Sequence, residues 1–83
     1  MHLSILTASQ IVFNGTVQSV GLPGTVAPFQ ILAGHGPMIS SLVKGNITYT
    51  QEDNLYSFSI QHGFVSIARD EVKVVCAPME AIN

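Results

Sequence analysis

Three histidines, five carboxylates and one cysteine are among the side chains of this sequence that could bind a metal, transfer a proton or act as a nucleophile. His2, His35 and His62 stand far apart, and none has a Cys, Asp or Glu nearby at metal-ligand spacing. Several such ligands must converge on one point to hold a metal ion, and this spacing gives no sign of that. We therefore predict no metal site and no cofactor.

The carboxylates do not form a catalytic pattern. Glu52-Asp53 and Asp70-Glu71 are adjacent pairs in polar stretches typical of hairpin loops, where neighbouring side chains diverge into solvent. The sequence also contains no G-x-S-x-G motif for a nucleophilic serine and no glycine-rich loop for phosphate. These features favour a protein that is not an enzyme.

The single cysteine, Cys76, lies in the mostly apolar run 72–77. It has no second cysteine with which to form a disulfide within the chain. A free cysteine in such a run behaves as a small apolar side chain. We predict that Cys76 is buried and has a structural role.

Charge is confined to the second half of the chain. Charged residues make up 10% of the 83 residues, against about 25% in an ordinary soluble domain, and all of them follow Val43. Because charged side chains are depleted at the centres of protein interfaces, a partner is expected to cover part of residues 1–43. The alternative is a small β domain that is charge-poor there. With three Lys and Arg residues and a net charge of −2, the chain offers no basic surface, and nucleic-acid binding is not expected.

The sequence shows no signal for export and no membrane span. The first ten residues lack the basic region of a secretory signal. Every apolar stretch is interrupted by Gly, Pro, Ser or Gln before the roughly 18 residues that a spanning helix needs. We expect a cytoplasmic protein with no direct membrane insertion.

Turn-forming residues recur at intervals of about seven to thirteen residues along the chain. They lie at 14–15, 21–24, 33–37, 44–46, 52–54, 62–63 and 69–71. This spacing leaves room only for short strands, and it predicts an all-β sandwich or barrel with no helix of useful length. Asn14-Gly15 is the clearest hairpin signal, because both residues tolerate the positive φ of a type I′ turn.

Apolar and polar residues alternate between these turns, as they do in half-buried strands. The alternation is clearest in residues 3–5, 47–50 and 56–60. Ile39 and Leu42 are further predicted core residues. Pro78 is expected to end the last strand, because proline cannot donate a hydrogen bond to the sheet.

Residues 19–42 read SVGLPGTVAPFQILAGHGPMISSL, which resembles the epsilon subunit of bacterial F-type ATP synthases. The similarity continues through residues 44–47, 58–65 and 72–77, so it covers nearly the whole chain in order. The resemblance implies a flattened β-sandwich of about ten short antiparallel strands. This domain would be formed by residues 1–77, followed by a short C-terminal tail of residues 78–83.

The resemblance also implies a function. In this family the domain lies at the foot of the rotating central stalk, packs on the gamma subunit and rests on the polar loops of the membrane c-ring. It transmits torque in proton-driven ATP synthesis and catalyses no reaction, which implies a peripheral protein on the cytoplasmic face of the bacterial plasma membrane. The family's C-terminal helical hairpin has no counterpart in these 83 residues, so an inhibitory arm is not expected.

Four residues match interface positions of the family. Pro28 and His35 resemble positions that face the c-ring, and Thr7 and Ser40 resemble positions on the gamma-facing side. Many members carry an acidic residue at the position of Pro28, so an ion pair to the c-ring is not expected there. For His35 the alternative is a histidine that anchors its loop by a hydrogen bond to the backbone.

The residues also leave a second function open. The chain could be an unrelated small β-sandwich that serves as a protein-interaction or carrier module. A lipoyl-type carrier needs a modifiable lysine in an acidic hairpin, whereas Lys44 beside Gly45 has no flanking acid. The sequence therefore favours the rotor subunit.

Overall fold

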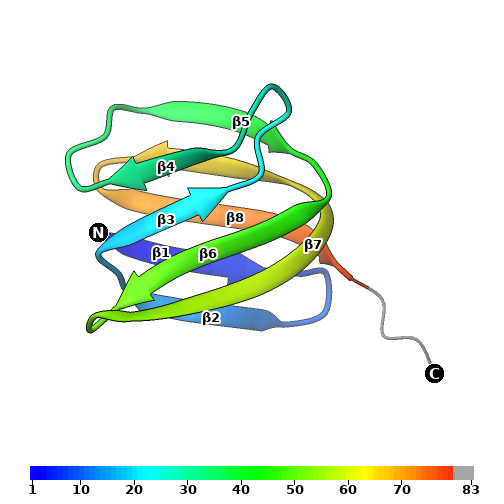
Figure 1. The fold of residues 1–83 in the computed structure, drawn as a ribbon, viewed down its shortest axis with the longest axis horizontal. Helices are drawn as coiled ribbons and strands as arrows, with labels where there is room; N and C mark the ends of the chain where they lie inside the picture. Colours follow the sequence, from blue (N-terminus) through cyan, green and yellow to red (C-terminus); the bar gives the residue numbers. More distant parts are fainter. Residues whose placement is uncertain (80–83) are drawn as a thin grey trace.

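A computed structural model describes residues 1–79, and these form eight β-strands and no helix (Figure 1). The strands are β1 (His2–Leu6), β2 (Ile11–Thr16), β3 (Ser19–Leu22), β4 (Phe29–Leu32), β5 (Met38–Leu42), β6 (Gly45–Gln51), β7 (Asn54–Ala68) and β8 (Glu71–Pro78). The predicted all-β class is confirmed. Pro78 is the last residue of β8, as expected, whereas most of the predicted tail, residues 80–83, lies outside the described residues.

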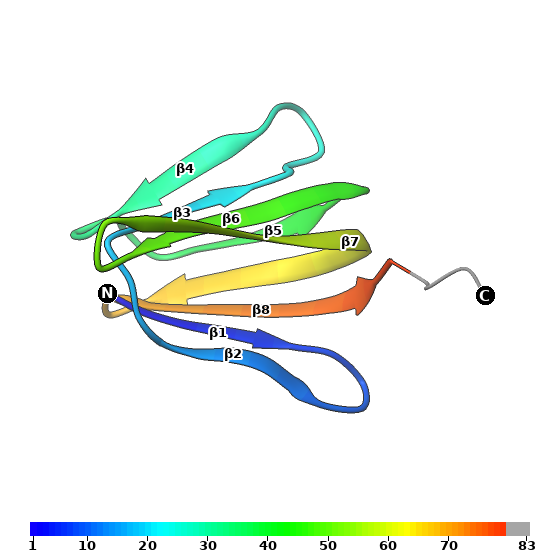
Figure 2. The same ribbon diagram turned by 60° about the horizontal axis from the view of Figure 1, so that its bottom comes forward.

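The strands follow the order β2-β1-β8-β7-β6-β3-β4, and β5 also pairs with β7. The first half of β7 pairs with β6 and the second half with β8 and β5, so this strand of 15 residues passes from one layer into the other. Figure 2 shows β2, β1 and β8 in one layer and β6, β3 and β4 in the second.

Two details of the predicted sandwich are wrong. The described residues form eight strands rather than about ten, and β7 runs through the turn expected at His62-Gly63. A register shift between Ile60 and His62 bends β7 there without breaking it. The sheet is also not wholly antiparallel, since β1 and β8 pair in parallel.

The core lies between the two layers and is formed by the side chains on the inward faces of the strands. Its fully buried side chains include Leu3, Ile5, Ile47 and Ile60, which confirms the predicted alternation. No polar or charged side chain is buried among residues 1–79. The core therefore depends on apolar contact, and each strand is oriented by the alternation of its own sequence.

The hairpin predicted at Asn14-Gly15 is wrong, because both residues lie within β2. β2 instead pairs with β1 through Gly15↔Leu3 and Asn14↔Ser4. A Cβ atom added to Gly15 would lie 3.0 Å from the Phe13 ring and 3.1 Å from the Gln51 amide nitrogen. The glycine therefore serves packing between strands and not a turn, and tertiary pairing outweighs the local turn preference.

The tight turns with positive φ occur at two other places, both of them predicted turns. Glu52 and Asp53 have φ of 51° and 65° between β6 and β7, and Arg69 and Asp70 have φ of 51° and 63° between β7 and β8. Positive φ at both central residues is the requirement of a type I′ turn. The Gln18 side chain bonds Asp53 twice, at 2.9 and 3.1 Å, and thereby fixes the first turn without glycine.

Cys76 is buried, as predicted, and its thiol donates a weak hydrogen bond to the Leu6 carbonyl at 3.6 Å. Burial raises the pKa of the Cys76 thiol above its ordinary value. The folded chain therefore keeps this proton at a pH where the unfolded chain loses it.

We expect the urea midpoint of unfolding to fall as the pH rises from 8 to 10, with a smaller fall in Cys76→Ala. Because the pKa is raised in the folded state, the stabilisation is complete below the unfolded pKa and is lost as pH rises through the folded one. Tyr49, whose pKa is also raised by burial, remains in both proteins and so cancels in the comparison. Equal falls in the two proteins would contradict the expectation.

Candidate functional site

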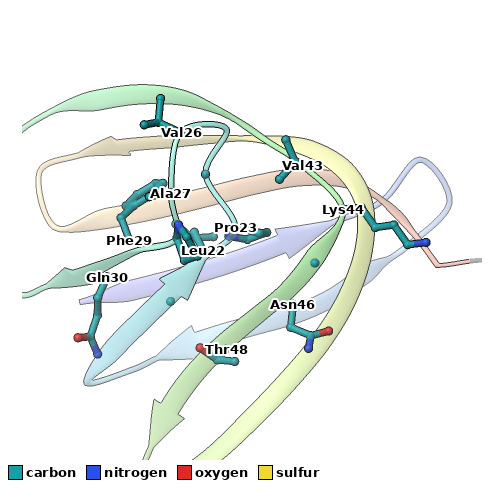
Figure 3. A pocket seen from close by; sticks show the side chains of 14 residues that line it. Leu22, Pro23, Val26, Ala27, Phe29, Gln30, Val43, Lys44, Asn46 and Thr48 are labelled. Atoms are coloured by element: carbon teal, nitrogen blue, oxygen red, sulfur yellow. The ribbon is translucent and has the colours of Figure 1, made fainter.

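A groove of about 590 Å³ opens between the β3–β4 loop (residues 23–28) and the first half of β6 (Figure 3). We call it the loop groove. Its walls combine apolar side chains such as Pro23, Val26 and Phe29 with the single cation Lys44, and they include no carboxylate. A cationic partner would therefore find no ion pair here. Pro28, predicted to face the c-ring, lines this groove.

The β3–β4 loop is held in place through Gly24. A Cβ atom at this position would lie 2.6 Å from the Ala27 carbonyl oxygen and 2.8 Å from the Phe29 ring, so the loop closes only over a glycine. Gly24 also forms a β-bridge with Leu42, and the Val43 N–H donates to the Pro23 carbonyl at 2.9 Å. These contacts fasten the loop to the end of β5 and leave Val26 fully exposed.

His35 lies in the turn between β4 and β5. The turn depends on Gly34, whose φ of +86° is strained for other residues. The ring nitrogen Nδ1 of His35 lies 2.7 Å from the Gly36 carbonyl oxygen, and because a carbonyl only accepts, Nδ1 carries the hydrogen. This bond favours the anchoring role of His35. The ring is nevertheless exposed, and its Nε2 makes no hydrogen bond to the described residues.

The two residues predicted for the c-ring interface do not lie side by side, and neither do the two predicted for the gamma interface. Pro28 directly precedes β4 and His35 follows it after two residues, so a strand about 13 Å long, at about 3.3 Å per residue, separates them. Thr7 follows β1 and Ser40 lies in β5, on opposite sides of β8 and β7 in the same layer. Ser40 is half-buried beside Leu42 on the inner face of β5, and its hydroxyl donates to the Ser41 carbonyl.

An exposed apolar surface crosses the outer face of this layer. Four side chains that are neighbours across adjacent strands form it, through the pairs Ile11↔Leu6, Leu6↔Val75 and Val75↔Phe64. Ile11, Val75 and Phe64 are 65%, 49% and 60% exposed. We call these four residues the outer apolar row. A second hollow, of about 370 Å³, adjoins Phe64 and Val75 near Ala8 and Pro78.

The outer face of the other layer has different chemistry. It presents hydroxyl and amide groups, among them Asn46 and Ser59, which share a hydrogen bond of 2.6 Å, and Ser19 and Thr50, which share one of 3.3 Å. Leu32 and Leu55 are exposed on the same face, beside Ser19 and Thr50. Ser19 and Thr50 separate these two leucines, whereas the four side chains of the outer apolar row adjoin one another. The outer apolar row is therefore the better candidate for a face covered by a partner.

Sequence reasoning did not identify the outer apolar row, because its members come from four separate strands. It also placed Ile39 in the core, which is wrong, since this side chain is 79% exposed. Met38, Ser40 and Leu42 alternate inward along β5, so Ile39 must point out. Leu42 is buried as predicted, and the alternation in MISSL is the signal that separates the two residues.

Among residues 1–79 no three His, Cys, Asp or Glu side chains are grouped closely enough to hold a metal ion. The same residues contain no helix that is long and apolar enough to cross a bilayer. The described surface presents a groove and an exposed apolar face.

Residues 1–82 match the family model of the ATP synthase delta/epsilon chain, beta-sandwich domain. The chain belongs to this family. It is 35% identical to the ATP synthase epsilon chain of Protochlamydia amoebophila over 83 residues, which covers 98% of this chain and 56% of the relative. It is 34% identical to the epsilon chain of Magnetococcus marinus over 75 residues, which covers 90% and 55%. The predicted epsilon-type β-sandwich is thus confirmed, and the alternative of an unrelated module is excluded.

Solved structures share the fold of this epsilon-type domain. A chain in the central stalk and c-ring of the Tetrahymena thermophila mitochondrial ATP synthase superposes with a TM-score of 0.79 at 13% identity, over 93% of this chain and 63% of that one. A chain of the Euglena gracilis mitochondrial ATP synthase gives 0.83 at 18% identity, over 98% and 54%. The chain therefore spans little more than half the length of most of these relatives.

Proposed function

We propose that this chain is a non-catalytic component of the central stalk of an F-type ATP synthase. It links the gamma subunit to the polar loops of the c-ring during proton-driven ATP synthesis, as a peripheral protein on the cytoplasmic face of the bacterial plasma membrane. The observation that carries the proposal is the match of residues 1–82 to the delta/epsilon β-sandwich family.

The outer apolar row and the loop groove each bind one of these two partners. The outer apolar row suits the gamma subunit, because an apolar face on a domain this small is stabilised when a partner covers it. The loop groove suits a c-ring loop that is polar and not basic, since its walls carry one cation and no carboxylate. Pro28 then contributes shape, and His35 holds the turn at the other end of β4.

Coupling in the complete enzyme tests the proposal. ATP synthase complexes depleted of their own epsilon chain would be reconstituted in vesicles, and ATP hydrolysis and proton pumping measured with and without this chain. We expect the chain to restore proton pumping per ATP hydrolysed. Hydrolysis that stays uncoupled, or a chain that does not bind the complex, would contradict the proposed function.

A further inference from the structure

The edge of the sheet at β2 differs from the other edges. Within residues 1–79 three strands, β2, β4 and β5, have a neighbour on one side only, and residues 54–58 of β7 pair with β6 alone. β4 and β5 are short, and each directly follows a proline, Pro28 or Pro37, which limits pairing at an edge. β2 is longer, lies outermost in its layer (Figure 2), and contains neither proline nor a charged residue.

The direction of the backbone groups along β2 follows from one hydrogen bond. The Val17 N–H donates to the Met1 carbonyl at 2.9 Å, so the backbone of Val17 faces the β1 side. Backbone groups alternate from residue to residue in an antiparallel strand, so Gly15 and Phe13 also face β1, and Asn14 and Thr16 face away. The Thr16 carbonyl confirms this, because it accepts a bond of 3.0 Å from the Gln51 side chain on the outer side.

Asn14 therefore directs its backbone N–H and carbonyl away from the sheet. The one register shift of this pair lies between Ile5 and Leu6, beside the start of β2, so residues 13–16 keep a regular strand register. Asn14 is exposed, and no strand of the described chain pairs with this side of β2. Such an edge is a template for one more strand.

We infer that β2 accepts an extended, uncharged segment of the gamma subunit as an additional strand, hydrogen-bonded at Asn14. β1 and β2 contain no Lys, Arg, Asp or Glu, so a charged segment would find no partner charge along this edge. The outer apolar row ends on β2 at Ile11, which is 65% exposed, so a strand added to this edge lies beside the end of that row. This inference rests on the proposed function, in which the gamma subunit covers the row.

Two substitutions at one position test the inference. Asn14→Pro removes the outward N–H and leaves the ladder to β1 intact, whereas Asn14→Ala changes only the side chain. Binding to the co-expressed gamma subunit is measured by calorimetry, with the thermal midpoint of each free variant as a check of folding. We expect Asn14→Pro to bind at least about tenfold more weakly and Asn14→Ala to bind within about twofold of the original chain.

Hydrogen exchange of the unaltered chain gives a readout that does not depend on any variant. The Asn14 amide should exchange at least about tenfold more slowly in the gamma complex than in the free chain, while the Phe13 amide is protected in both. Unchanged exchange at Asn14, or equal binding by the proline and alanine variants, overturns the inference and leaves the proposed function standing. If the chain does not bind gamma, both the inference and the proposed function are overturned. Sedimentation that shows a dimer abolished by Asn14→Pro would assign the edge to a second copy and overturn the inference.

Discussion

Gly24→Val is expected to lower the free energy of unfolding by about 2 to 3 kcal/mol, because the new side chain has no room. Its Cβ alone would lie 2.6 Å from the Ala27 carbonyl oxygen. The loop cannot move aside easily, since Gly24 bridges to Leu42 and the Pro23 carbonyl is bonded to Val43. Urea unfolding measures the change.

Gly34→Val is the matched control for this prediction. Gly34 has a φ of +86°, but a Cβ atom added there would have no neighbouring atom within 4 Å, so valine meets backbone strain without a clash. We expect a loss of about 1 to 2 kcal/mol. If the two variants have the same urea midpoint, the close approach at Gly24 does not limit the loop.

Phe64→Asp is expected to weaken binding to the gamma subunit by about 100-fold or more while the free domain stays folded. Phe64 is 60% exposed on the outer face of its layer, between β8 and β5, so the substitution removes little apolar contact from the core. Covering an unpaired carboxylate with an apolar partner surface costs several kcal/mol, of the order that such a loss requires.

Ser57→Asp is the control, because it places the same charge on the hydroxyl-rich outer face of the other layer. Ser57 is exposed and pairs with Thr48. We expect its binding to gamma to stay within about threefold of the original chain. Should Ser57→Asp prove the more damaging variant, the partner covers the second layer and the assignment of the outer apolar row is wrong.

The strands and most turns could be predicted from the sequence because they depend on local patterns. The alternation at Leu3 and Ile5 and at Ile47 identified the inward faces, and the polar pairs Glu52-Asp53 and Arg69-Asp70 marked true turns. Asn14-Gly15 misled the prediction, because its local turn preference is outweighed by pairing with β1. The pairing of β1 with β8 joins residues about 70 apart, and no local pattern carries that information.

The candidate site was less predictable for the same reason. Pro28 could be assigned to an interface only through the family resemblance, and the groove that it lines joins residues 21–30 to the distant residues 43–48. The outer apolar row depends on the register of four strands, and a shift of one residue in any of them would remove a member. Ser40 was assigned to a surface although strand alternation turns its side chain inward.

The position of β8 between β1 and β7 has a consequence for the order in which the domain can form during translation. β1 is made first and its central neighbour last, so in an emerging chain β1 has only β2 as a hydrogen-bonded neighbour until residues 71–78 have left the ribosome. The layer is completed only when β8 enters between two strands that already exist. We therefore expect this domain to finish folding after synthesis of β8, with β1 the segment that a chaperone would protect in the meantime.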